Sequence, residues 1–285
     1  MKKVSRRSFV KKTAAITSGA IASTMSIKSF ANVNENKKLK LSVVGCGGRG
    51  SGAVVQALTA DDNVELISMA DTFRDRIDSS INGIKDHFGD SKKIKIKEKN
   101  LFVGFDAYKR AIDLCDVVIL TTPPGFRPHH FEYAVNNDKH IFMEKPVATD
   151  ATGVRKVLEL ARKAKDKKLN VVVGLQRHYE NKYINLHNKV KSGDIGKIVS
   201  GQVYWNDGGV WTNNRKPNQT ELEYQMRNWY YFTWICGDHI VEQHIHNIDV
   251  ANWFIGEYPS YAQGMGGREV RNGKEHGQIF DHHFV

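Results

Sequence analysis

Cysteine is scarce in this sequence, and long hydrophobic runs are missing after residue 31. Three cysteines occur among 285 residues, Cys46, Cys115 and Cys236, and each lies in or beside an apolar run. Three widely separated cysteines give neither a disulfide framework nor a zinc knuckle, so we expect buried free thiols. Because no apolar stretch after residue 31 reaches roughly 18 residues, we expect no membrane span.

Acidic side chains are absent from the first 31 residues, which contain seven lysines and arginines. The whole chain has a net charge of +11, so taking away these seven charges leaves +4 for the remainder. After residue 31, the basic side chains are interspersed with many acidic ones. The sequence therefore argues against the strongly basic surface of a nucleic-acid-binding protein.

The basic segment has the order of an export signal. Residues 5–11 read Ser-Arg-Arg-Ser-Phe-Val-Lys, and a weakly apolar stretch then leads to a small-x-Ala cleavage site at residues 29–31. This order is typical of signals recognised by the twin-arginine export machinery, which carries folded proteins. We predict a signal peptide at 1–31, a linker at 32–38 and a periplasmic protein. A disordered basic tail is the alternative.

The next segment has the order of a dinucleotide site. An apolar strand pattern leads into Gly-Cys-Gly-Gly-Arg-Gly at residues 45–50, followed by a helical pattern, a second strand pattern and Asp71. Gly45 permits a tight turn, Gly47 lets the backbone approach a pyrophosphate, and Gly50 lets the helix pack close to the strand. The helix N-terminus attracts phosphates, and the acid can bind a ribose diol. We therefore predict a nucleotide site.

Apolar strands alternate with helical patterns from residue 39 to residue 175. Further strands are expected at 117–120, 140–143 and 171–174, with helices at 131–136 and 152–167 and a lysine-rich solvated helix or loop at 85–99. Continuous apolar strands are typical of a parallel sheet that helices cover on both faces. We predict an α/β fold whose residues 39–175 form an N-terminal Rossmann domain with a doubly wound parallel sheet.

The pattern changes in residues 176–285. We expect a strand at 199–205, a polar turn-rich segment at 207–218, an aromatic stretch at 229–234 and a helix over about 238–253. The last residues, 279–285, read as the start of another strand. A sheet domain should not end there, so we expect the chain to be truncated at its C-terminus.

Four motifs together resemble one family. They are the glycine motif at 45–50, Thr-Pro-Pro at 122–124, Glu-Lys-Pro at 144–146 and Glu-Gln-His-Ile-His-Asn-Ile-Asp at 242–249. In this order they are similar to the glucose-fructose oxidoreductase, inositol dehydrogenase and rhizopine-catabolism (Gfo/Idh/MocA) family. The resemblance implies a Rossmann domain followed by an α/β domain with an open, mostly antiparallel sheet. It also implies sugar-like substrates, homo-oligomers and, in exported members, a retained nicotinamide nucleotide.

Lys145 is a candidate catalytic residue. It follows an expected strand and precedes Pro146, so it lies at the carboxyl edge of the sheet, where cofactor and substrate meet. An ammonium there can bind a reacting hydroxyl and stabilise negative charge on its oxygen. The alternative is an ordinary surface lysine.

Glu242 and His246 are spaced four residues apart on the expected helix and would share a face. A histidine can accept a hydroxyl proton while hydride leaves the same carbon, and a carboxylate one turn away can orient it. The resemblance places His246 at the family's catalytic histidine, Glu242 where aspartate is usual, and His244 where glycine is frequent. A polar helix flank without catalytic function is the alternative.

The remaining candidates are contacts to cofactor and substrate. Aromatic rings can stack on sugar faces, although such rings more often belong to a core. The candidate cofactor contacts are Gly45, Gly47, Arg49, Gly50, Asp71, Thr122, Pro123, His130, Glu144 and Lys145, and the candidate substrate contacts are Arg177, His178, Trp229, Tyr230 and Asp249.

These residues predict an NAD(P)-dependent oxidoreductase acting on a hydroxyl of a sugar or glycoside. Asp71 favours NAD because a carboxylate repels a 2′-phosphate, although the nearby Arg74 leaves NADP possible. No metal is assigned to the site, and a metal on Glu242, His244 and His246 is a variant. Two other classes stay open: a glycosidase or lyase that oxidises its sugar only transiently, and a non-catalytic sugar- or nucleotide-binding protein.

Overall fold

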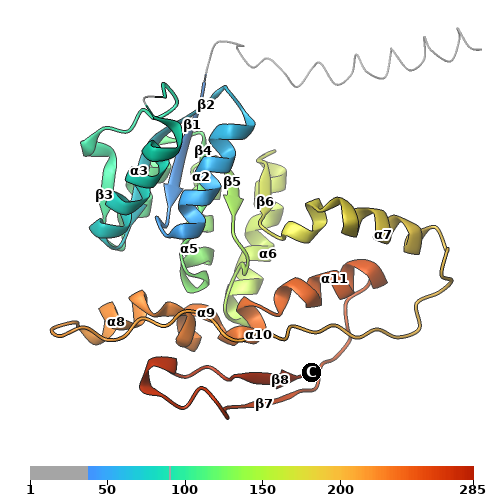
Figure 1. The fold of residues 1–285 in the computed structure, drawn as a ribbon. Helices are drawn as coiled ribbons and strands as arrows, with labels where there is room; N and C mark the ends of the chain where they lie inside the picture. The colour runs from blue at the N-terminus through green and yellow to red at the C-terminus, as the bar shows by residue number, and fades with distance from the viewer. Residues whose placement is uncertain (1–37, 90) are drawn as a thin grey trace, which may run out of the picture. The chain divides into compact units, whose positions relative to one another are not determined.

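The computed structural model describes residues 38–89 and 91–285, in which a six-stranded parallel sheet is the central element (Figure 1). The expected signal peptide and nearly all of the linker lie outside the described residues. Residues 39–285 form one compact unit, so a domain boundary at residue 175 stays a prediction. The strands are β1 (Leu39–Val44), β2 (Val64–Asp71), β3 (Leu101–Val103), β4 (Val117–Leu120), β5 (His140–Met143) and β6 (Val171–Val173).

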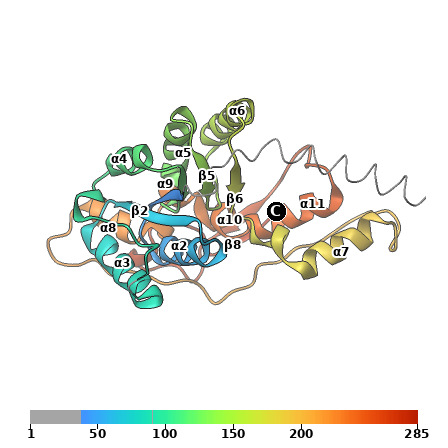
Figure 2. The same ribbon diagram turned by 90° about the horizontal axis from the view of Figure 1, so that it is seen from above.

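Helices cover both faces of this sheet, as Figure 2 shows. Two pack on one face through one apolar core, and three pack on the other face through a second core. The first pair is α2 (Gly48–Ala60) and α3 (Arg74–Phe88), and the second set is α4 (Ala107–Leu114), α5 (Arg127–Asn136) and α6 (Ala151–Asp166). Burial on both faces explains why the strands are apolar almost throughout. The predicted doubly wound sheet is confirmed.

The strand order places a crevice beside the glycine motif. The sheet runs β3-β2-β1-β4-β5-β6, so the chain winds outward from β1 in one direction and then returns to β4 on the other side. Loops leaving the carboxyl ends of β1 and β4 diverge at this switch point, and ligands of such sheets bind there. Strands β4 and β5 have the predicted bounds, whereas the sequence analysis did not identify β3 and α4.

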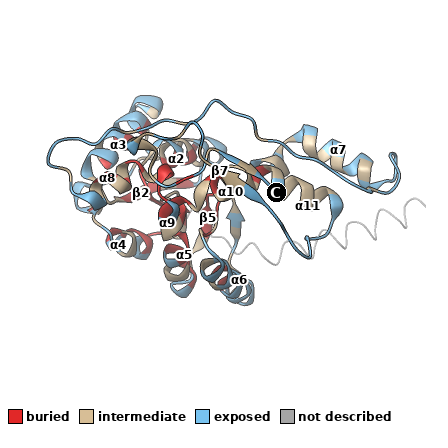
Figure 3. Cartoon of the chain, turned by 90° about the horizontal axis from the view of Figure 1, so that it is seen from below, coloured by how far each residue is buried: buried red, intermediate tan, exposed pale blue. Residues whose placement is uncertain are grey.

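In Figure 1, the helices and strands from residue 221 onward lie below the carboxyl edge of the sheet, and the helix at 181–191 lies beside β6. The helices and strands of residues 176–285 are α7 (Asn181–Lys191), α8 (Glu221–Arg227), α9 (Thr233–Cys236), α10 (Asp238–Glu242), α11 (Ile245–Ile255), β7 (Met265–Gly267) and β8 (His282–Phe284). Short 3₁₀ turns are η2 (Glu98–Asn100), η3 (Pro124–Phe126), η4 (Gln176–Tyr179), η5 (Trp229–Tyr231) and η6 (Lys274–His276). Figure 3 shows that buried residues gather around the sheet and α9, whereas α7 is exposed or half-buried along its length.

Two expectations for this part were wrong. Residues 199–205 form no strand; Val199 and Tyr204 are largely exposed, and no described strand pairs with this segment to supply the hydrogen bonds that a strand needs. The expected helix over 238–253 is divided into α10 and α11. The amide of His244 bonds to the carbonyl of His239 five residues earlier, and this wide turn ends the first helix.

The C-terminal strand is present as predicted, in β8, which pairs antiparallel with β7. This pair is the only antiparallel sheet among the described residues. The three cysteines are free and buried, as expected. In the described ranges, no helix combines the length and the apolar character that crossing a membrane requires.

Candidate functional site

The glycine motif forms a tight turn between β1 and α2. Gly45 has a φ of +98°, and a β-carbon there would lie 2.5 Å from the backbone nitrogen of Thr122, so only glycine fits. A β-carbon on Gly50 would overlap the carbonyl oxygen of Gly45. At Gly47, no protein atom lies within 4 Å of the β-carbon position, and this residue lines a pocket. The protein leaves that space open for a ligand to approach the backbone.

Asp71 lies at the carboxyl end of β2, next to the glycine turn. Its Oδ2 atom accepts the amide of Cys46 at 2.7 Å, and its Oδ1 atom accepts the amide of Phe73 at 2.9 Å. Burial raises the pKa of the Asp71 carboxyl, while these two amides and the nearby Arg76 oppose the increase. The carboxylate is fixed at the edge of the pocket, where it can accept bonds from a ribose.

Arg74 does not reach this pocket. Its guanidinium donates to Asp78 at 2.8 Å and to Glu98 at 2.6 Å on the exposed surface. Arg76, two residues further on, lines the pocket instead. Among the two arginines that follow Asp71, Arg76 is therefore the one that borders the pocket.

The pocket has a volume of about 510 Å³ and joins the Rossmann sheet to the C-terminal part of the chain. The glycine turn, Asp71, Thr122, Pro123 and His130 line it from the sheet. From the C-terminal part, it is lined by Trp211, Asn213, Met226, Arg227 and Trp229. Trp229 thus borders the same pocket as the glycine turn and Asp71.

Arg227 links α8 to α3 across this pocket. Its guanidinium donates to both carboxylate oxygens of Asp75, at 2.9 and 3.0 Å, and lies 3.9 Å from the centre of the Phe73 ring. The sequence analysis did not identify this residue. Its partner is 152 positions away, so no local pattern could indicate the contact.

Two candidate cofactor contacts hold others in position. Glu144 is buried and accepts the Arg49 guanidinium at 2.6 Å, which ties the glycine turn to the end of β5. The Nδ1 atom of His130 lies 3.1 Å from the Thr122 hydroxyl. Burial, with the nearby Arg127, lowers the pKa of His130 to about 3. The ring is therefore neutral around pH 7 and can share a hydrogen bond with the hydroxyl.

Lys145 and Glu242 form a buried ion pair. The Nζ atom of Lys145 donates to the Glu242 carboxylate at 2.7 Å and to its backbone carbonyl at 2.6 Å. The two side chains are only 12% and 10% exposed. Burial raises the pKa of the Glu242 carboxyl, and the cations of Lys145 and Arg127 oppose that increase. The carboxylate predicted to orient His246 is thus bonded to the lysine instead.

His246 lies in the first turn of α11 and is buried. The Trp205 ring stacks on it with 5.8 Å between ring centres. Burial, together with the nearby cations Lys145 and Arg177, lowers the pKa of His246 to about 4. The imidazole is therefore neutral around pH 7, which is the form that accepts a proton.

Arg127 is a further site residue that the sequence analysis missed. Its fully buried guanidinium donates to the carbonyl of Leu120 at 2.7 Å and to that of Pro146 at 3.4 Å. Burial lowers its pKa to about 10, which leaves it charged at neutral pH. The two hydrogen bonds of Arg127 tie the end of β4 to the cis Lys145–Pro146 peptide. A charged residue at the start of a helix gives no sequence signal for such a role.

Arg177 and His178 contact α11. Arg177 donates to Asn247, and its guanidinium lies 5.6 Å from the Trp205 ring. His178 shares a 2.8 Å contact with the carboxylate of Asp249. Arg177 is thus near His246, the candidate catalytic histidine. Asp249 pairs with His178 instead of with His246 one turn before it.

Tyr230 belongs to the aromatic core and is 4% exposed. It borders a second pocket of about 290 Å³, which is also lined by Trp205, Gln243 and His244. His244 faces the ring of His239, with 4.7 Å between ring centres. Among the described residues, Glu242, His244 and His246 do not bring three potential metal ligands together. Asp238, His239 and His283 do, with one potential ligand atom of each within 4.8 Å of the others.

Comparison with known proteins agrees with this geometry. Residues 39–174 match the model of the oxidoreductase family GFO_IDH_MocA, described as an NAD-binding Rossmann fold. The inositol 2-dehydrogenase of Salmonella typhimurium is 27% identical over 221 residues, covering 77% of this chain and 55% of the relative. A glycosyl hydrolase family 109 protein of Solibacter usitatus is 26% identical over 218 residues, covering 72% of this chain and 47% of the relative.

A solved structure gives the same fold. The scyllo-inositol dehydrogenase of Lactobacillus casei, with bound NAD(H) and scyllo-inositol, aligns with a TM-score of 0.58 and 20% identity, over 82% of this chain and 61% of that one. The chain spans about half the length of the curated relatives that it matches. Residues 39–174 therefore carry the NAD-binding Rossmann fold that the Gfo/Idh/MocA oxidoreductase family model describes.

Proposed function

We propose that this protein oxidises a hydroxyl of a sugar, cyclitol or glycoside with NAD as the acceptor. The observation that carries the proposal is the buried Lys145–Glu242 pair at the carboxyl end of β5, with the neutral His246 in its electrostatic reach. The names of the inositol dehydrogenase relatives support this substrate class.

The glycine turn and Asp71 fit the cofactor. The open space at Gly47 and the helix N-terminus behind it suit a pyrophosphate, and the fixed carboxylate of Asp71 suits a ribose diol. When bound there, NAD supplies the hydride acceptor.

The chain's own residues handle the oxygen and its proton. The Lys145 ammonium donates to the reacting hydroxyl oxygen and stabilises the negative charge that develops on it. Glu242 keeps this lysine charged and aimed, through the 2.7 Å contact. A ring nitrogen of His246 takes the hydroxyl proton as the hydride leaves the carbon, so the alcohol loses one proton and one hydride.

We also propose that the protein is exported with its nucleotide bound. The twin-arginine motif at residues 6–7 supports the route, because that pathway carries folded proteins. A nucleotide retained in the folded protein would be recycled between two substrates.

One experiment tests the proposed function. The purified protein is denatured, and the released nucleotide is identified by mass spectrometry. Native protein is then mixed with a panel of inositols, sugars and glycosides, and reduction of bound nucleotide is followed by absorbance in a single turnover. We expect NAD to be found and at least one polyol to reduce it. Bound nucleotide that no member of the panel reduces would favour a non-catalytic binding protein.

A second candidate function is favoured by the glycosyl hydrolase family 109 relative. In this alternative, the sugar is oxidised transiently, the neighbouring C–H becomes acidic and loses its proton, and the glycosidic oxygen leaves as an alcohol. In a hydrolase, water then adds to the double bond; in both cases the hydride returns to the ketone. Product analysis separates the two functions. Glycoside cleavage without net NADH would identify the hydrolase or lyase, and a stoichiometric ketone with NADH would identify the dehydrogenase.

A further inference from the structure

A second group of chemically competent side chains lies outside the proposed redox machinery. It consists of Asp238 and His239 at the start of α10 and His283 in β8, each offering one ligand atom within 4.8 Å of the others. His239 is buried, and the other two are half-buried. Imidazole nitrogens bind divalent transition metals, and a carboxylate beside such a ring can orient it.

Asp238 fixes the orientation of the His239 ring. Its Oδ1 atom lies 3.0 Å from Nδ1 of His239 and also accepts the His239 amide at 2.6 Å. Because a carboxylate only accepts, Nδ1 carries the hydrogen and the lone pair is on Nε2. Carboxylate–histidine pairs of this kind orient metal ligands.

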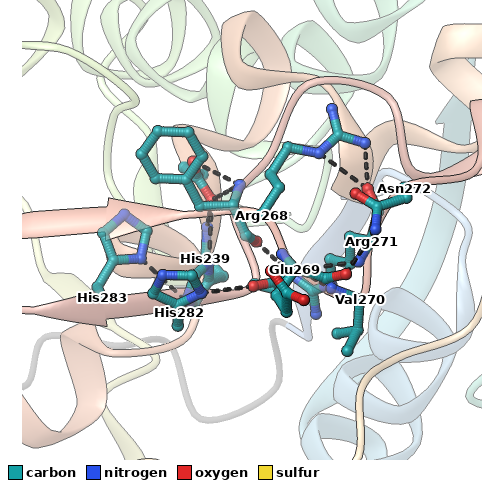
Figure 4. Close-up of polar contacts among 11 residues, drawn as sticks. His239, Arg268, Glu269, Val270, Arg271, Asn272, His282 and His283 are labelled. Atoms are coloured by element: carbon teal, nitrogen blue, oxygen red, sulfur yellow. Dashed lines mark hydrogen bonds and ion pairs between the residues drawn. The ribbon is translucent and has the colours of Figure 1, made fainter.

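The free lone pair of His239 points at a second imidazole. Its Nε2 atom lies 2.9 Å from Nδ1 of His283 (Figure 4). Two nitrogens bound to one tetrahedral zinc ion at 2.0–2.1 Å are roughly 3.3 Å apart. A small outward movement of the two rings therefore makes room for the ion, provided that His283 moves its proton to Nε2.

The backbone around the group is built to hold these rings. Asp238 has a φ of +68°, a left-handed conformation that is uncommon for residues other than glycine. Gly266 is paired with His283 across the hairpin, and a β-carbon at Gly266 would lie 3.0 Å from the His283 ring. Glycine at this register position gives the ring its space.

The group opens onto the second pocket, which His239, His244, Asp281 and His283 line. His282, the next residue along β8, is exposed and bonds instead to Asp281 at 2.7 Å. An ion bound by the two imidazoles would keep open coordination positions toward this pocket. Trp205, which stacks on His246, also borders it.

We propose that His239 and His283 bind one divalent transition-metal ion of the zinc class, and that Asp238 positions the His239 ring for this by accepting its Nδ1–H. The site is distinct from the nucleotide pocket and does not depend on the proposed redox reaction.

Metal uptake by the purified full chain tests this proposal. The protein is stripped with a chelator and titrated with Zn²⁺ against a chromophoric competitor, and Co²⁺ is added separately to record its visible spectrum. We expect one saturable Zn²⁺ site per chain. Bound Co²⁺ should give the spectrum of low-coordinate nitrogen and oxygen ligation.

Three variants locate the site. His239→Gln and His283→Gln should each weaken Zn²⁺ binding by roughly 100-fold, and Asp238→Asn by roughly 10- to 100-fold. Asparagine tolerates a positive φ, so Asp238→Asn keeps the fold even if a histidine variant does not. His129→Gln, on an exposed histidine of α5, is the matched control and should bind as the parent does.

NAD binding, measured in parallel, should be unchanged in all four variants. Absence of saturable Zn²⁺ uptake by the parent protein would overturn the proposal. Uptake that survives unchanged in both His283→Gln and Asp238→Asn would also overturn it, because the ion would then be held elsewhere.

Discussion

At the scale of single residues, the proposed reaction depends most on the charge of Lys145. Lys145→Met removes the ammonium and keeps most of the side-chain volume, so we expect turnover to fall by roughly 100-fold or more with nucleotide affinity largely kept. The measurement is single-turnover reduction of bound NAD. Lys163→Met, on the exposed face of α6, is the control.

This variant also leaves the buried Glu242 carboxylate without its partner. Lys145→Met combined with Glu242→Gln removes that uncompensated charge, so it separates lost catalysis from lost stability. If the double variant is stable and still turns over at the parent rate, Lys145 is a structural residue.

His246 should set the acidic limb of the pH–rate profile. Burial and two nearby cations lower its pKa to about 4, so the proton-accepting neutral form is present above that pH and is lost as pH falls through it. We expect kcat/KM to rise through about pH 4 and then to level off. His246→Asn should lower the plateau and abolish this limb. A limb that persists in the variant would assign it to another group.

The combination of Lys145→Met and His246→Asn should cost much less than the sum of the single effects. Both residues would stabilise the same transition state, so once one is replaced, the loss of the other lowers the turnover rate only a little more.

Asp71 should decide between the two nicotinamide cofactors. Asp71→Ala removes the ribose acceptor and also the repulsion toward a 2′-phosphate, so NAD affinity should fall roughly 10- to 100-fold while NADP affinity falls less. Calorimetric titration with both nucleotides measures this. Asp71→Asn, which keeps an acceptor oxygen for one of the two amides of Cys46 and Phe73, controls for collapse of the turn. Equal losses for both nucleotides would contradict this assignment.

At the scale of elements, close contact between β1 and α2 depends on Gly50. A β-carbon there would overlap the Gly45 carbonyl, so Gly50→Ala should displace the helix and weaken NAD binding by roughly 100-fold. Gly52→Ala in the same helix is the control. It meets only the end of the Arg49 side chain at 3.6 Å and should gain about 0.5–1 kcal/mol of stability. Thermal unfolding and NAD titration of both variants give the comparison.

Elements with strong local signals could be predicted from the sequence. The apolar strands β4 and β5 and the glycine turn follow from patterns a few residues long. Strand β3 has three residues, and its neighbour α4 has eight, so neither offers enough periodicity. The division between α10 and α11 depends on one wide turn. The spacing of hydrophobic residues gives no indication of such a turn.

The same difference between local signals and tertiary contacts applies to the candidate site. Asp71 and Lys145 could be placed because a strand end fixes their positions. The partner of the Glu242 carboxylate could not be predicted, because Lys145 lies 97 residues away in the sequence. In the structure, the cations of Lys145 and Arg127 both act on this carboxylate. Arg127 and Arg227 were missed for the same reason, because tertiary contacts alone give them their roles.

At the scale of the whole molecule, export should depend on the twin arginines. Replacing Arg6 and Arg7 together with lysine keeps the charge and removes the motif that the receptor recognises, so precursor should accumulate in the cytoplasm. Cell fractionation followed by immunoblotting measures the distribution. A matched replacement of Lys2 and Lys3 with arginine should leave export unchanged. Periplasmic protein at the parent level in the Arg6 and Arg7 variant would exclude this route.

The three buried cysteines give the folded protein a chemical property of its own. Burial raises the pKa of the thiols of Cys46, Cys115 and Cys236, so almost none is thiolate at neutral pH. Because the thiolate is the reactive form, the native chain is protected from oxidants and from mispairing in an oxidising compartment. Each lies in a different apolar core, so opening of a core exposes its thiol. The rate of alkylation therefore reports the fraction of molecules that have opened, without any label added to the protein.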